Sequence, residues 1–149
     1  MSTVALLPMY GWDTIPWKKF RRSVFKLQKR IYRATLQGQR KEVRKLQRLL
    51  MSSRAAKFLA VRRVTQDNSG KRTAGVDGVK SLTKRQRVRM AQNLRIDGSA
   101  KPVRRVWIDK ADSEEQRPLG IPVMANRAAE TLVKEALEPE WEARFEANS

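Results

Sequence analysis

Basic and aromatic side chains alternate in the stretch at residues 101–123. Arg105 and Trp107 are two positions apart, so an extended backbone places both on one face, because side chains of a strand alternate between faces. Val106 and Ile108 would share the other face. An aromatic ring beside a guanidinium can stack on a nucleobase while the charge binds a phosphate. The spacing therefore predicts a nucleic-acid contact.

The same stretch has the pattern of a β-hairpin. Apolar residues occur on both sides of a polar connection at residues 109–116, as in two short strands joined by a turn. Lys110 and Arg117 flank this turn. A flexible ammonium and a forked guanidinium both suit phosphate oxygens, although two solvated turn charges are the alternative interpretation.

The charge of the whole chain also favours a polyanionic partner. Its 149 residues carry a net charge of +18, which indicates nucleic acid or an anionic membrane surface. Residues 17–63 contain seventeen lysines and arginines against one acid, Glu42, so a basic helical arm is expected at residues 16–64. The candidate contacts in the arm, the following loop and the hairpin are Arg21, Arg22, Lys29, Arg30, Arg33, Arg40, Lys41, Arg44, Lys45, Arg48, Arg62, Arg63, Lys71, Arg72, Arg104, Arg105, Trp107, Lys110 and Arg117.

The chain lacks the residues on which several kinds of chemistry depend. The chain contains neither cysteine nor histidine, so disulfides, thiolate nucleophiles, cysteine zinc sites and most histidine-based hydrolytic mechanisms are excluded. We expect no cofactor and no bound metal. No window reaches the length of a membrane span, and the N-terminus lacks the basic region of a signal peptide. These features predict a protein of the cytoplasm or of an organelle interior such as the chloroplast stroma.

Hydrophobic periodicity predicts the elements that would position these residues. Apolar residues at alternating spacings of three and four predict a helix at 16–37, and a second helix packs antiparallel after Gly38. The first stripe also allows an intermolecular coiled coil, but it is short. Further helices are expected up to residue 64, at 84–95 and at 125–137, where Pro139 should end the last one before a short helix with Trp141 and Phe145 in the core. The fold expected is one mainly α domain, residues 1–149, with a small antiparallel β-hairpin at 101–123.

Residues 117–122 read Arg-Pro-Leu-Gly-Ile-Pro, and residues 104–110 read Arg-Arg-Val-Trp-Ile-Asp-Lys. This pair of segments resembles the fingers hairpin of group II intron reverse transcriptases (maturases). Other matching segments, in the family's order, are Trp17, Leu27-Gln28, Leu46-Gln47, residues 60–65, 75–78 and 137–142. The resemblance covers nearly everything after residue 11. It implies the N-terminal fingers region of such an enzyme, with intron RNA as the partner or, for a reassigned domain, another structured RNA such as ribosomal RNA.

The hairpin also departs from this family. The resemblance places Lys110 and Arg117 over the template and the phosphates of the incoming nucleotide. Asp109 replaces the proline expected before Lys110, and the turn carries Asp112, Glu114 and Glu115, which would repel a phosphate. We therefore expect the hairpin to keep its fold and to have lost this role in nucleotide handling.

Catalysis is not expected of this chain. The family places its metal-binding carboxylates in a palm domain, in a Tyr-Ala-Asp-Asp type of turn, and no such string occurs here. The sequence thus predicts a non-catalytic RNA-binding protein. Two alternatives stay open: an N-terminal fragment or split half of an active enzyme, paired with a palm-containing chain, or an adaptor that docks on a protein or ribonucleoprotein assembly through its apolar N-terminus and acidic C-terminal helices.

Overall fold

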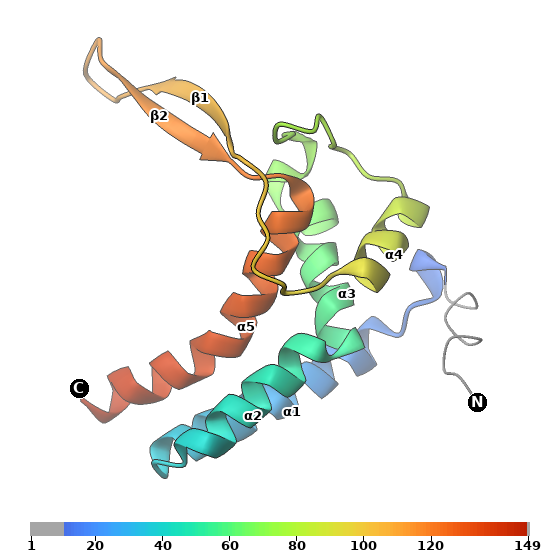
Figure 1. Ribbon diagram of the computed structural model, residues 1–149, viewed down its shortest axis with the longest axis vertical. Helices are drawn as coiled ribbons and strands as arrows, with labels where there is room; N and C mark the ends of the chain where they lie inside the picture. Colours follow the sequence, from blue (N-terminus) through green and yellow to red (C-terminus); the bar gives the residue numbers. More distant parts are fainter. Residues whose placement is uncertain (1–10, 149) are drawn as a thin grey trace.

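The structure is a computed structural model that describes residues 11–148, and it is mainly α with one small antiparallel hairpin, which confirms the expected fold class (Figure 1). Its elements are α1 (Trp17–Leu36), α2 (Arg40–Ser52), α3 (Arg54–Arg62), α4 (Lys84–Asn93), β1 (Arg104–Asp109), β2 (Gln116–Ile121) and α5 (Met124–Ala147). Short turns of 3-10 helix form η2 (Trp12–Thr14) and η4 (Ser69–Arg72), and η3 (Arg63–Asp67) is a π-helical turn. The apolar N-terminal stretch, named above as part of a possible docking surface, lies almost wholly outside the described residues.

Helices α1 and α2 form an antiparallel pair, as their periodicity predicts (Figure 1). Gly38 sits in the connection with a φ of +70°, a left-handed conformation that glycine adopts without steric cost. Val43, Leu46 and Leu50 are buried on the inner side of α2. Leu49 also belongs to the apolar pattern that predicts this helix, and we expected it on the same inner side. It is exposed, because successive helical residues are about 100° apart and the core accommodates only Leu50 of the two leucines.

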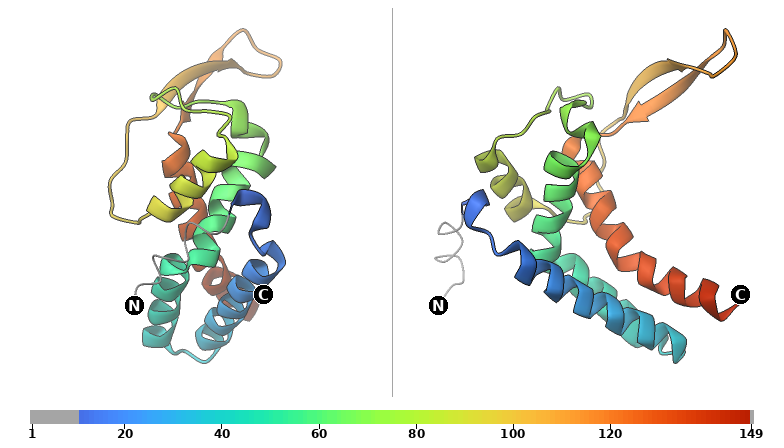
Figure 2. Two further views of the ribbon diagram at one scale, coloured as in Figure 1. Left: turned by 90° about the vertical axis from the view of Figure 1, so that its right-hand side faces the viewer. Right: turned by 180° about the vertical axis from the view of Figure 1, so that it is seen from behind.

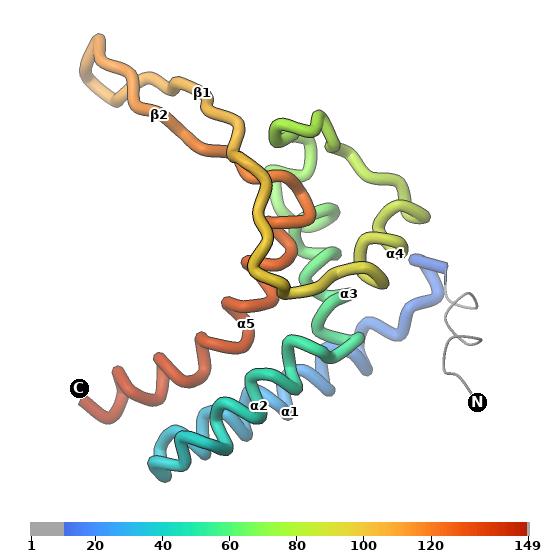
Figure 3. The backbone as a smooth tube through the Cα atoms, viewed as in Figure 1, coloured from blue at the N-terminus to red at the C-terminus, as the bar shows by residue number. Residues whose placement is uncertain are grey.

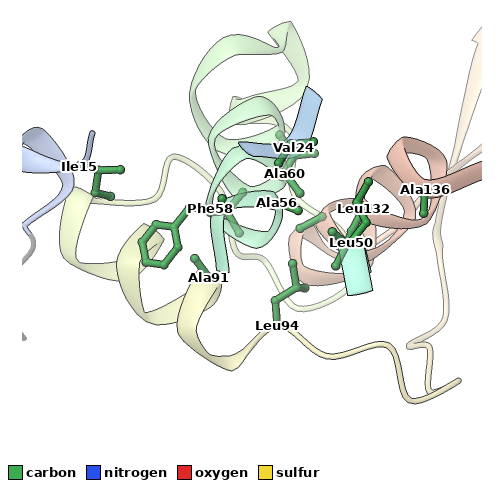
Figure 4. Packing of buried hydrophobic residues seen from close by; sticks show 14 of the residues in the cluster. Ile15, Val24, Leu50, Ala56, Phe58, Ala60, Ala91, Leu94, Leu132 and Ala136 are labelled. Carbon is green, nitrogen blue, oxygen red and sulfur yellow. The ribbon is translucent and has the colours of Figure 1, made fainter. Parts of the chain in front are cut away.

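The core lies where α1, α2, α3, α4 and α5 meet (Figure 4). Val24, Leu50, Phe58 and Leu132 are buried there, each from a different helix. Full burial of one such side chain stabilises the fold by about 1.5–3 kcal/mol. The apolar stripe of α1 is therefore covered by helices of its own chain, which accounts for the stripe without the alternative of an intermolecular coiled coil.

Helix α5 runs through Pro139 without a break, so the predicted end of the helix at this proline is wrong (Figure 3). Proline lacks the N–H that would bond to the carbonyl of Glu135 one turn earlier. The side-chain amide of Gln28 on α1 supplies that missing donor, with Nε2 3.1 Å from the Glu135 carbonyl oxygen. A residue from another helix thus satisfies the group that the proline leaves unpaired.

The C-terminal half of α5 also places two aromatic side chains differently from our expectation. Trp141 and Phe145 are 49% and 68% exposed, respectively, and pack against each other with ring centroids 6.0 Å apart. We expected both in the core of a separate short helix. Because α5 continues as one helix, its buried face carries Ala136, Pro139 and Ala143, and both rings lie outside that face.

The hairpin extends away from the helical body, as the views in Figure 1 and Figure 2 both show. Its strands form a two-stranded antiparallel sheet in which Val106 pairs with Leu119 and Trp107 with Pro118. Both strands therefore present two faces outside the helical core.

Candidate nucleic-acid interface

The basic helical arm presents its charges to solvent. All ten of its candidate residues on α1 and α2 are exposed: Arg21, Arg22, Lys29, Arg30, Arg33, Arg40, Lys41, Arg44, Lys45 and Arg48. The single acid in this part of the chain, Glu42, forms only a loose ion pair with Arg30, at 3.8 Å. An excess of positive charge therefore remains on the surface of the α1–α2 pair.

Several acids of α5 are engaged in contacts with the inner sides of these helices. Glu135 accepts a hydrogen bond from Gln28 at 2.8 Å, and Glu140 accepts one from Gln47 at 3.1 Å. Tyr32 donates to Glu146, a hydrogen bond that raises the pKa of the tyrosine above its usual value. These carboxylates bind their own chain rather than neutralise the exposed face of α1 and α2.

Four of the five predicted contact residues at positions 62–104 have partners within the protein. Arg62 lies over the ring of Trp17, 4.8 Å from its centroid, and Arg63 forms an ion pair with Glu135. Lys71 donates from Nζ to a backbone carbonyl at 3.2 Å, and Arg104 donates from Nε to another at 2.9 Å. Arg72 is exposed. The structure thus separates the candidates into solvent-facing cations and cations that also brace the fold.

The hairpin places Arg105 and Trp107 on one face of β1, as the alternation predicts. Trp107 is 55% exposed, whereas Val106 and Ile108 on the opposite face are partly covered. The ring is therefore accessible to a ligand.

Lys110 and Arg117, the two cations that flank the turn of the hairpin, have different surroundings. Lys110 forms a 2.9 Å ion pair with Glu115, one of the acids expected to disturb a phosphate site. Arg117 pairs in register with Ile108, on the face of the sheet opposite Trp107. The structure does not bring Arg117 together with the Arg105 and Trp107 pair.

The base of the hairpin depends on Arg127, a residue that we did not single out in the sequence. Its guanidinium donates to the carbonyl oxygens of Pro122 at 2.8 Å, Gly70 at 3.0 Å and Thr73 at 2.5 Å. Burial lowers its pKa from the usual value for arginine. One side chain thus joins the start of α5, the end of β2 and the loop after η3, and a lone arginine in a helical pattern gives no sequence signal of such a role.

Gly75 completes this junction. A Cβ atom at this position would lie 2.7 Å from both the N and the Cα of Val123, closer than real contacts allow. The glycine therefore permits the loop to pack directly on the backbone before α5. The match at residues 75–78 pointed to this loop, but the close approach itself is visible only in the fold.

Trp12 and Phe25 are two further aromatic residues that sequence reasoning missed. Trp12 is buried, donates to Gln66 at 2.8 Å and has the guanidinium of Arg87 5.6 Å from its ring centroid. Phe25 is exposed on α1. Its position next to Val24 but outside the three-four stripe was a signal that could have identified it as a surface aromatic.

Two features of the described residues bear on other kinds of function. Residues 11–148 contain no group of three or more acidic, histidine or cysteine side chains placed to hold a metal ion. Within the same range, no helix is long and apolar enough to cross a membrane.

The chain is similar in sequence to one protein family and to several known proteins. A family model described as the N-terminal domain of reverse transcriptase matches residues 12–94. Maturase-like protein 1 of Euglena gracilis is 33% identical over 133 residues, which are 87% of this chain and 29% of that protein. Protein YkfC of Escherichia coli strain K12 is 36% identical over 108 residues, 68% of this chain and 28% of that protein.

Maturase-like protein 1 of Euglena longa is 26% identical over 136 residues, 89% of this chain and 30% of that protein. The chain therefore spans less than a third of the length of each of these relatives.

Proposed function

The chain belongs to the family of N-terminal domains of reverse transcriptases, and on this basis we propose that it binds structured RNA through the exposed cations of α1 and α2. The observation that carries the proposal is that all ten candidate cations on these helices face solvent, while Glu135, Glu140 and Glu146 engage groups of their own chain. Intron RNA is the first ligand to test, because two of the similar proteins are named maturase-like.

The mechanism of binding is phosphate neutralisation. Each phosphate that pairs with a lysine or arginine releases condensed counterions, and this release favours binding at low salt. Double-helical RNA hides its base edges in a deep, narrow major groove, so a rigid basic surface selects mainly by the shape of the backbone. The arm therefore serves as a shape-selective contact and not as a reader of base sequence.

The salt dependence of binding tests this proposal. Affinity should fall steeply with salt, with a log–log slope of roughly −0.7 to −0.9 per phosphate neutralised. Reversal of four exposed cations to glutamate (Arg33→Glu, Lys41→Glu, Arg44→Glu and Arg48→Glu) should weaken binding and flatten the slope. The measurement is fluorescence anisotropy with a labelled structured RNA over a salt series.

A matched control has four exposed cations of another region reversed: Lys80→Glu, Arg85→Glu, Arg89→Glu and Arg95→Glu. The change in net charge is equal in the two variants, so a general charge effect would weaken both equally. We expect the control to lose less affinity and to keep most of the slope. Equal losses in the two variants would contradict a special role of the α1–α2 surface.

A docking role is a second candidate, and one observation favours it. Leu137, Trp141 and Phe145 recur every four residues along one face of α5, and all three are exposed. We infer that a palm-containing chain is the partner to test, because the relatives are more than three times as long as the matched segment. A native pull-down in which Trp141→Ala and Phe145→Ala release such a chain would support docking, and unchanged recovery would reject it.

A further inference from the structure

Helix α1 carries an exposed ridge of cation, aromatic ring and cation. Arg21, Phe25 and Lys29 are four residues apart in turn, so they lie on the same side of the helix. Phe25 is 59% exposed, and the ammonium of Lys29 lies 5.4 Å from the centroid of its ring. The ridge from Arg21 to Lys29 is about 12 Å long, from the rise of 1.5 Å per helical residue.

Phe25 is among the lining residues of two surface hollows. The first, of about 360 Å³, has Val24 and Leu59 among its apolar lining residues and Arg21 and Arg62 among its cations. The second, of about 350 Å³, has the cations Lys29 and Arg63 and the acids Glu135, Glu138 and Glu142 among its lining residues. Space for a planar group is therefore available beside the aromatic face.

Three of the four acids that line these hollows have a cationic partner, and the fourth is Glu142. Glu138 lies 3.8 Å from Lys134. Arg62 lies 3.6 Å from Asp67, and Arg63 is paired with Glu135. Arg21 and Lys29 are exposed at the two ends of the ridge. Along the ridge, the aromatic surface of Phe25 thus has a positive charge on either side, which is the chemistry of a site for single-stranded nucleic acid.

We propose that Phe25 is a stacking platform for an unpaired nucleobase of the bound RNA, with Arg21 and Lys29 binding the phosphates on either side of it. The proposal rests on the proposed RNA-binding function and adds a preference for a loop, bulge or single strand. Bases inside a helix are stacked on their neighbours and cannot reach the ring, whereas unpaired bases can be splayed out onto aromatic side chains. A protein partner would need a continuous apolar patch, but the neighbours of Phe25 along the ridge are cationic.

The chain offers a matched pair of exposed phenylalanines with which to test this site. Phe25 is 59% exposed on basic α1, and Phe145 is 68% exposed on the acidic end of α5. Each would be replaced by alanine, and binding measured by fluorescence anisotropy with a labelled single-stranded oligouridylate and with a blunt RNA duplex of equal length. The salt series is repeated for each variant.

Phe25→Ala should weaken binding of the single strand about tenfold, within the range measured for one stacked base. Duplex binding and the salt slope should stay unchanged, because the ring releases no counterions. Phe25→Trp should bind at least as tightly as the unmodified protein. Phe145→Ala should change none of these quantities.

Three outcomes would overturn the proposal. If Phe25→Ala binds the single strand as tightly as Phe145→Ala does, while binding stays salt-dependent, the stacking site is rejected and the RNA-binding function stands. If Phe25→Leu restores full affinity, the contact is apolar and not aromatic stacking. If the unmodified protein shows no salt-dependent affinity for either RNA, both proposals fail.

Discussion

Trp107 is exposed on the hairpin face that it shares with Arg105. Its side chain is therefore available for binding and is not needed for packing against the helices. Had the ring packed against the helices, any loss of binding after its removal would follow from lost stability. Because it is 55% exposed, its removal should leave the free energy of unfolding nearly unchanged. Binding and stability can therefore be separated at this position.

We predict that Trp107→Ala and Arg105→Ala each weaken RNA binding about tenfold, as expected for the loss of one stacked base or one charged contact. Arg117→Ala should do less, because Arg117 lies on the other face and the acidic turn is close in sequence. Anisotropy titrations and thermal unfolding of the same three variants check this. A Trp107→Ala protein with a lower melting temperature and full affinity when folded would reject the stacking contact.

A second prediction at the residue scale concerns Gly75. Gly75→Ala would place its Cβ 2.7 Å from the backbone of Val123, so the loop or the start of α5 must shift. Overpacking of this kind costs about 1–3 kcal/mol, which urea unfolding can measure. Gly11→Ala is the control, since the nearest atom to its Cβ lies 4.0 Å away. Equal free energies of unfolding for Gly75→Ala and Gly11→Ala would show that the junction accommodates the extra Cβ atom without a measurable cost.

At the scale of elements, the continuity of α5 depends on a contact with α1. Gln28 donates to the Glu135 carbonyl that Pro139 leaves without its helical donor. A buried or partly buried acceptor that loses its partner costs about 1–3 kcal/mol. The inter-helix hydrogen bond therefore compensates for a proline in the interior of the helix.

A double-mutant cycle tests this compensation. Gln28→Leu alone should destabilise the protein by about 1–3 kcal/mol. In a Pro139→Ala background the cost should be smaller, because the alanine restores a backbone N–H for Glu135. Gln47→Leu is the control, because Gln47 bonds only to the side chain of Glu140. Chemical denaturation gives all the free energies, and equal costs of Gln28→Leu in both backgrounds would contradict the coupling.

The hairpin combines regular strand pairing with an acidic turn. The two strands pair in regular register from Arg104 opposite Ile121 to Asp109 opposite Gln116. At the turn, however, Lys110 is paired with Glu115. Glu115, one of the acids of the turn, is thus engaged with the cation that the resemblance places over a phosphate.

At the scale of the whole molecule, we propose that this chain does not itself polymerise nucleotides. Its 149 residues contain no Tyr-Ala-Asp-Asp turn, the kind of segment with which the resembled family holds two metal ions. Purified protein with template, primer, nucleotides and Mg²⁺ should extend nothing above a control without protein. The assay is primer extension, with an active reverse transcriptase as the positive control. Template-dependent incorporation that survives repurification would overturn this prediction.

The sequence by itself determined most of the elements, because their determinants are local. The three-four spacing from Trp17 to Ala34 specifies α1, and the alternation at residues 104–108 specifies β1. The charge asymmetry is equally a property of the sequence, and a helix with one apolar stripe must expose its lysines and arginines on the remaining faces. For this reason the exposure of the cations on α1 and α2 could be anticipated.

Only the tertiary structure decided which residues far apart in the sequence contact each other. Gln28 and Glu135 are 107 positions apart, so no local pattern could show that α5 continues through Pro139. The same limit applies to Arg62 and Arg63, whose ring and carboxylate partners come from other elements. Periodicity indicates which face of a helix is apolar, but which neighbour packs against a given side chain depends on the arrangement of all the helices.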